Sequence, residues 1–161
     1  MTTPAELSEA VRRAWAAVPA PPAEDLELME WGWGEAAARE FVGVRPVDVD
    51  IESRGFYAAT PLLDLPPRAA AAYLGTYLLS LLKGLRLQQV SGVFDDVLTR
   101  AHTLTALTLP SFWERVVPLL SPDCRRALVE VARYLPTVRD ELALTEEQVT
   151  ILAAETAVEE R

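Results

Sequence analysis

Histidine and cysteine support nucleophilic and acid–base chemistry, and this sequence has one residue of each type. His102 is the only histidine, so a two-histidine metal site is excluded and any Ser-His-Asp relay would have to use it. Cys124 is the only cysteine, and an arginine neighbour such as Arg125 or Arg126 can lower the pKa of a thiol. Because Cys124 also falls on an apolar helical stripe, we predict a buried, inert thiol. For His102 we predict a partly exposed side chain near a helix end.

Carboxylates provide the candidate binding surface. Residues 24–30 hold four acids, and residues 47–52 alternate apolar and acidic positions, so the acidic side chains of that segment would share one side of an extended backbone. A hard-cation site could use such carboxylates, but the glycine turn and spacing of a calcium loop are missing. We predict an acidic, partner-binding surface formed by Glu24, Asp25, Glu27, Glu30, Asp48, Asp50 and Glu52. The adjacent pair Asp95 and Asp96 is interpreted as a solvent-facing part of a helix.

Trp31 and Trp33 are the least core-like of the large aromatic residues. They alternate with glycines inside the acidic stretch, where a loop or turn is expected. Tryptophan is enriched at binding hot spots, because it buries a large area at a small cost in entropy. Two interpretations stay open: the pair belongs to the partner-binding surface, or it covers the core from a loop.

Charge argues against several classes of partner. The net charge is −9, a field that repels nucleic-acid phosphates and anionic lipid, so neither nucleic acid nor a membrane is expected as a partner. The acids concentrate at the two ends, with net charges of −7 over residues 1–64, +3 over 65–136 and −5 over 137–161.

No phosphate-binding glycine loop, C-x-x-C or H-E-x-x-H motif occurs, so neither a cofactor nor a metal is expected.

The expected location is the cytoplasm. A single cysteine cannot form an internal disulfide, and the first ten residues are polar and acidic, unlike a secretion signal. The most apolar stretch, residues 69–82, is shorter than the roughly 20 residues that cross a bilayer. We therefore interpret it as part of a buried helix.

Helix signals recur along the whole chain, and no second strand accompanies the alternating segment at 47–52. That segment is therefore expected to be extended or briefly helical, lying against the core. We predict an all-α, single-domain bundle of six or seven helices around a central apolar helix at about 67–83. Its parts are an N-terminal helix (1–18), an acidic connector rich in proline, tryptophan and glycine (19–34), a helical core (35–136) and an acidic C-terminal segment (137–161).

Local signals set the expected helix boundaries. Capping boxes are expected at Thr3, Ser111 and Thr145, because each is followed three residues later by Glu or Gln. Prolines 67 and 122 suit first helical positions, and a further helix is expected from about Val90. Gly84 is expected to end the central helix, and Gly75 in its middle indicates the close approach of a neighbouring backbone. Tyr73 and Tyr77 are expected in the core, with their hydroxyls at its rim.

The order of these features resembles an uncharacterised bacterial family of small helical proteins, known only as a domain of unknown function. The resemblance rests on residues 22–26, 39–43, 65–69, 73–78 and 120–122. It implies a small helical fold over about residues 14–136. It implies no activity, cofactor or site residue.

Three classes of function remain after these exclusions. The leading hypothesis is a non-enzymatic, acidic protein-binding domain, in its most specific form a bacterial immunity protein that inhibits a basic toxin. The first alternative is a small-ligand-binding or enzymatic domain with a pocket beside the helix of Tyr73 and Tyr77. The second alternative is a structural protein that self-associates through apolar helix faces.

Overall fold

The computed structural model describes residues 2–27, 41–52, 62–92 and 97–159, and within these ranges every regular element is helical. The predicted all-α class is confirmed. The longer helices are α1 (Pro4–Trp15), α5 (Pro67–Ser91), α6 (Val97–Leu107), α7 (Pro110–Val116), α8 (Pro122–Tyr134) and α10 (Glu146–Val158). The short elements are α2 (Glu24–Glu27), α9 (Arg139–Leu142) and the 3-10 helices η1 (Pro46–Asp48), η2 (Leu62–Asp64), η3 (Val117–Leu119) and η4 (Leu135–Val138).

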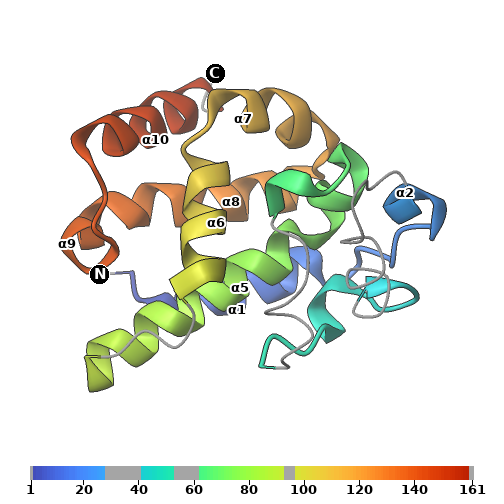
Figure 1. The fold of residues 1–161 in the computed structure, drawn as a ribbon, viewed down its shortest axis with the longest axis horizontal. Helices are drawn as coiled ribbons and strands as arrows, with labels where there is room; N and C mark the ends of the chain where they lie inside the picture. The colour runs from blue at the N-terminus through green and yellow to red at the C-terminus, as the bar shows by residue number, and fades with distance from the viewer. Residues whose placement is uncertain (1, 28–40, 53–61, 93–96, 160–161) are drawn as a thin grey trace.

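Helix α5 is the centre of the fold. It contacts α1, α6 and α7, while α8 packs against α1 on one side and α10 on the other (Figure 1). Leu74, Leu78, Leu81, Leu82 and Leu85 of α5 are fully buried, as expected for a helix that is apolar on nearly all sides. The apolar stretch at 69–82 is thus core, as predicted.

Two of the three predicted capping boxes are present. Thr3 and Glu6 cap α1 reciprocally, and Thr145 and Gln148 do the same for α10. The prediction at Ser111 was wrong: α7 begins at Pro110, two residues earlier than a cap at Ser111 would place it, and its N-cap residue, Leu109, makes no side-chain hydrogen bond. Proline at the first helical position fixes the starting φ angle by itself, so the helix begins without a polar cap.

The predicted C-terminal end of α5 was also wrong. The helix passes through the buried Gly84 and ends at Ser91, where Gly92 adopts the left-handed conformation with φ of 73°. The buried face continues with Leu85 beyond Gly84, so packing extends the helix to the next glycine. Val90, expected to begin a new helix, lies in the last turn of α5 and is 84% exposed, and the next helix in the described residues is α6 (Val97–Leu107).

Gly75 does mark a close approach, but of a side chain instead of a backbone. The indole of Trp15 lies directly over it: a Cβ atom at position 75 would stand 2.5 Å from Cδ2 and 2.6 Å from Cγ of the ring. The Trp15 Nε1–H donates to the Ala71 carbonyl at 3.3 Å, one turn earlier on α5. Trp15 is therefore at the centre of the α1–α5 contact and only 1% exposed.

Replacing Gly75 with alanine should therefore destabilise the protein, although alanine is the better helix former by about 1 kcal/mol. The new methyl group would overlap the buried indole of Trp15, and such overpacking costs about 1–3 kcal/mol. We expect a net loss of about 1 kcal/mol in the free energy of unfolding, measured by urea denaturation. The matched control is Gly75→Ala in a Trp15→Ala background, where the new methyl group meets no indole. A gain in stability for Gly75→Ala would show that the indole moves aside freely.

Residues 41–52 are fastened to α5 by two hydroxyl groups. Tyr73 donates to the carbonyl oxygens of Phe41 and Val44, and Thr76 donates to the Pro46 carbonyl at 2.8 Å. The Phe41 ring stacks on the Tyr73 ring, with centroids 4.2 Å apart. The segment therefore follows the core as a brief 3-10 helix, one of the two predicted forms. The alanine run at 36–38 also predicts a short helix from about Glu35 to Phe41, which lies outside the described residues except for Phe41.

Candidate functional site

Neither of the two isolated reactive side chains shows the geometry of a nucleophilic site. Cys124 is buried, as predicted, and its Sγ–H donates to the Ala14 carbonyl at 3.2 Å. Burial raises the pKa of this thiol, and the nearby Asp123 raises it further, while a hydrogen bond with Ser121 acts in the opposite direction. His102 is half-buried in the middle of α6 instead of near its end. The thiol is therefore held protonated and packed, as predicted.

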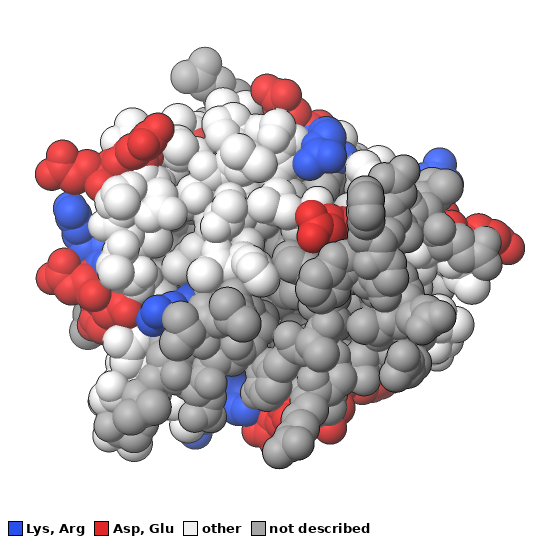
Figure 2. Space-filling view, viewed as in Figure 1, with Lys and Arg blue, Asp and Glu red and all other residues white. Residues whose placement is uncertain are grey.

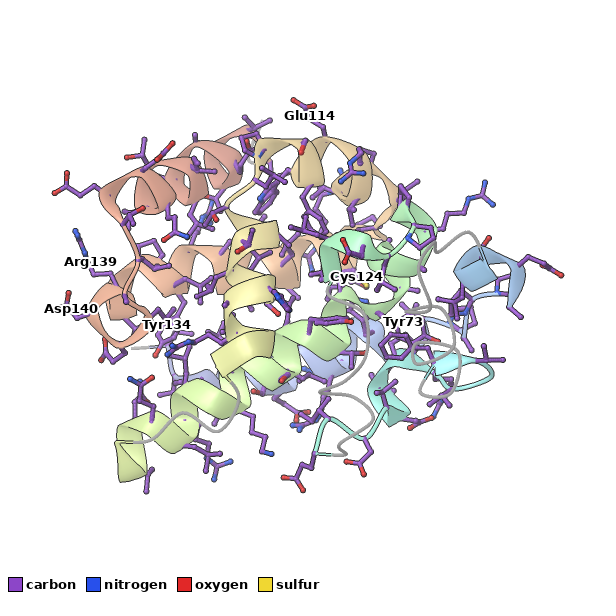
Figure 3. All side chains as sticks on the ribbon, in the orientation of Figure 1. Tyr73, Glu114, Cys124, Tyr134, Arg139 and Asp140 are labelled. Atoms are coloured by element: carbon purple, nitrogen blue, oxygen red, sulfur yellow. The ribbon has the colours of Figure 1, made fainter. Side chains whose placement is uncertain are left out.

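The two tyrosines of α5 lie in the core, and a pocket of about 340 Å³ borders the same helix at Arg68, Ala71 and Ala72. Tyr73 and Tyr77 are both buried, and the Phe41 ring contacts both of theirs. Burial raises the pKa of each phenol, and Asp64 adds to the effect at Tyr77. The prediction that the hydroxyls reach the rim is wrong for Tyr73, whose hydroxyl donates inside the core (Figure 3). Both side chains thus serve packing and anchoring.

The predicted acidic surface is only partly within the described residues. Glu30, Trp31 and Trp33 lie outside them, as do Asp95 and Asp96, and the Glu27 side chain is also outside the description. Glu24, Asp48, Asp50 and Glu52 are exposed and Asp25 is half-buried.

Cations offset part of this surface. Asp48 pairs with Arg45 at 2.8 Å, and Glu52 pairs with Lys83 at 2.7 Å. Asp50 accepts a hydrogen bond from the backbone N–H of Glu52. The carboxylates face solvent as predicted, but two of them carry a neutralising partner.

A second group of carboxylates lies where α9 meets α10. Its members are Asp140, Glu141, Glu146 and Glu147, which we call the acidic corner; all four are exposed. Figure 2 shows acidic side chains along the corresponding edge of the molecule, and Figure 3 shows Asp140 and Arg139 pointing outward there. Among the described residues, none of the four makes an ion pair within 4.0 Å. These four carboxylates therefore lack the ion pairs that Asp48 and Glu52 make, although Arg139 lies beside them.

Hydrogen bonds hold the acidic corner rigidly. The α9 helix ends in a left-handed Ala143, and the backbone N–H of Leu144 returns to the Arg139 carbonyl at 2.9 Å. The Thr145 capping box then starts α10. The Gln88 side chain donates to the Glu141 carbonyl at 3.1 Å and so ties α9 to α5. The carboxylates are consequently presented from a backbone that is fixed on both sides.

A third acidic group lies between α7 and α10, and its carboxylates are less available to a partner because they are partly buried or paired. Glu155 is half-buried, and burial raises the pKa of its carboxyl, with repulsion from Glu114 and Glu159 adding to the shift. Glu159 pairs with Arg125 at 3.4 Å. This group is partly desolvated and paired, and so presents less charge to a partner than the acidic corner does.

A pocket opens at the far end of α5, where α1, α8 and η4 meet. Its volume is about 610 Å³, and its lining residues are Thr2, Thr3, Pro4, Gln89, Glu130, Arg133, Tyr134, Thr137 and Val138. Tyr134 is half-buried, and its hydroxyl accepts a hydrogen bond from Gln89 Nε2 at 3.3 Å. Figure 3 shows Tyr134 between the end of α8 and the last turns of α5. We call this the Tyr134 pocket.

The acidic corner and the Tyr134 pocket were not among the predicted site residues. The charge of −5 over residues 137–161 does signal the corner, because four of the seven acids in that segment are its members. The pocket has no comparable signal, since its walls come from three segments far apart in the sequence.

Comparison with protein-family models, with curated proteins and with solved structures finds no match to this chain. The resemblance to a family of unknown function therefore stays a prediction. In the described ranges, no helix combines the length and apolar character needed to cross a membrane. The same ranges hold no cluster of three or more His, Cys, Asp or Glu side chains suited to a metal ion.

Proposed function

We propose that this protein is a non-enzymatic binding domain whose exposed carboxylates dock a basic protein partner. The observation that carries the proposal is the acidic corner: four exposed acids on a rigid backbone, without ion pairs among the described residues. Such charges raise the rate at which a partner of opposite sign associates, because they act before contact is made. The predicted surface around Asp48 and Glu52 would add a weaker field of the same sign.

The most specific form of this proposal is an immunity protein that inhibits a basic toxin. A toxin that cleaves nucleic acid or acts on membranes presents cationic side chains to its target, and an acidic inhibitor can compete for them. The net charge of −9 supports this form. A fixed backbone at the corner would also reduce the entropy lost on binding.

The test is affinity capture from the native lysate, followed by association kinetics with the captured protein at low and high salt. Neutralising the corner with Asp140→Asn, Glu141→Gln, Glu146→Gln and Glu147→Gln should slow association about tenfold at low salt and reduce its salt dependence. Dissociation should change less, because exposed rim charges act mainly on the association rate. The melting temperature of the variant is measured alongside, since Glu146 and Glu147 also stabilise the first turn of α10.

The matched control neutralises an equal number of acids on the predicted surface, with Glu24→Gln, Asp48→Asn, Asp50→Asn and Glu52→Gln. Because two of these are already paired, this variant should associate faster than the corner variant. The proposal fails if the captured partner is itself acidic, or if neutralising both surfaces leaves association as fast as in the wild type.

A further inference from the structure

We propose that the pocket beside Arg68, Ala71 and Ala72, which we call the Arg68 pocket, binds a small monocarboxylate with an apolar body. Its volume of about 340 Å³ lies within the range of roughly 300–1,000 Å³ that is usual for small-molecule sites. Its walls come from the segment after α1, the first turns of α5, η3 and the start of α8. The site shares no residue with the acidic corner and does not depend on the proposed protein partner.

The walls of the Arg68 pocket are mostly apolar. Pro19 and Pro21 line it from the segment after α1, Leu119 and Leu120 from the segment before α8, and Ala72 from α5. Leu119 is 48% exposed, so apolar surface stays open to water at this site, and an apolar ligand would cover it. Proline and alanine side chains lose almost no rotamer freedom when they are covered, which lowers the entropy cost of binding.

Arg68 carries the only charge among the described residues that line the pocket. It is exposed, and it makes no ion pair within 4.0 Å with another residue that the structure describes. The Cys124 thiol in the lining is held protonated and adds no negative charge. The lining of the Tyr134 pocket, by contrast, includes both Glu130 and Arg133. The Arg68 pocket therefore favours an anion, and a guanidinium binds a carboxylate through paired hydrogen bonds.

A second hydrogen-bond donor for a carboxylate is Ser121, the N-cap residue of α8. Its Oγ accepts the backbone N–H of Cys124 at 3.2 Å, and no acceptor for its hydroxyl proton lies among the described residues. The neighbouring Asp123 is not part of the lining and pairs with Arg126 at 3.4 Å, which offsets part of the repulsion that an anion would meet. A ligand with one carboxylate and an apolar body therefore matches both the donors and the walls.

The experiment titrates the full chain at neutral pH with hexanoate, hexan-1-ol, hexylamine and acetate, and follows binding by protein NMR. Salt at about 0.15 M screens the net charge of −9, which would otherwise repel the anions. Hexan-1-ol keeps the apolar body without the charge, hexylamine carries the opposite charge, and acetate lacks the body.

We expect hexanoate to bind saturably with a Kd of about 1 mM. It should shift the amide resonance of Cys124, which donates to Ser121, and the indole N–H resonance of Trp15, which donates to the carbonyl of Ala71 in the lining. The other three compounds should bind about tenfold more weakly, because each lacks either the carboxylate or the apolar body.

The variants separate the charge from the apolar body. Arg68→Gln should weaken hexanoate binding about tenfold and leave hexan-1-ol binding unchanged, while Arg68→Lys should keep part of the preference. Ser121→Asp retains a side chain that can cap α8 but adds a negative charge, so it should also weaken hexanoate binding. Ala72→Phe should weaken binding of both compounds, since its ring would fill the pocket. The matched control, Arg86→Gln, lies on the same helix outside the lining and should leave every affinity unchanged.

Melting temperatures establish that each variant is folded before its affinity is compared. The corner variant should bind hexanoate normally, so failure of the partner proposal is distinguishable from failure of this one. Absence of saturable hexanoate binding to the wild-type chain, equal affinity for hexanoate and hexan-1-ol, or indifference to Arg68→Gln would each overturn the proposal.

Discussion

Replacing Leu78 with aspartate should lower the free energy of unfolding by about 4 kcal/mol or more, the largest effect expected for a single substitution in this chain. Leu78 is fully buried in the middle of α5, where a carboxylate would have neither water nor a cation beside it. A loss of this size is comparable to the whole stability of many domains, so partial unfolding at room temperature is expected. Far-ultraviolet circular dichroism during urea denaturation measures it.

The control for this substitution is Val90→Asp in the same helix. Val90 is 84% exposed, so the same change from an apolar residue to an acid should alter stability by about 0.5 kcal/mol or less. An unchanged melting temperature for Leu78→Asp would mean that a different face of α5 is buried.

Replacing Trp15 with alanine should lower the free energy of unfolding by about 3–5 kcal/mol, because it leaves a large cavity between α1 and α5. It also removes the hydrogen bond to the Ala71 carbonyl. The contact with Gly75 adds a sharper expectation: in the Trp15→Ala background, Gly75→Ala should become stabilising. The methyl group would then occupy part of the cavity without a clash. The higher helix propensity of alanine would therefore stabilise the protein.

The full double-mutant cycle measures this coupling by urea denaturation. Trp15→Phe is the milder comparison, since it keeps one aromatic ring beside Gly75 and loses the second ring of the indole together with its N–H. If Gly75→Ala has the same effect with and without the indole, the close packing of Trp15 over Gly75 is not what sets the cost.

Sequence reasoning succeeded where one local signal decides the structure. Pro122 and the Thr145 capping box start their helices as predicted, and the apolar run of α5 lies in the core. It failed where two local signals competed. Pro110 started α7 ahead of Ser111, and continued burial carried α5 through Gly84 to Gly92. The end of α5 depends on packing, and the start of α7 depends on which of two helix-start signals is stronger. A pattern of residue types gives neither.

In the candidate sites, too, local features can be predicted from the sequence and features that depend on packing cannot. The acidic corner follows from the local excess of acids over residues 137–161, although the absence of ion pairs to other described residues does not. At Asp48 and Glu52, by contrast, the pairing cations come from position 45 and from the distant Lys83 on α5. The Tyr134 pocket combines residues 2–4 with Gln89 and residues 130–138, a combination set only by how the helices pack.

The position of α1 between α5 and α8 has a consequence for protein synthesis. Trp15 bonds to a residue 56 positions later, and Ala14 to a cysteine 110 positions later. As the chain leaves the ribosome, the apolar stripe of Leu7, Val11 and Trp15 therefore has no docking surface until α5 emerges, and no complete one until α8 does. Contacts that close such long loops slow folding. The nascent chain should consequently engage chaperones that bind exposed apolar segments, and α1 should be the segment they hold longest.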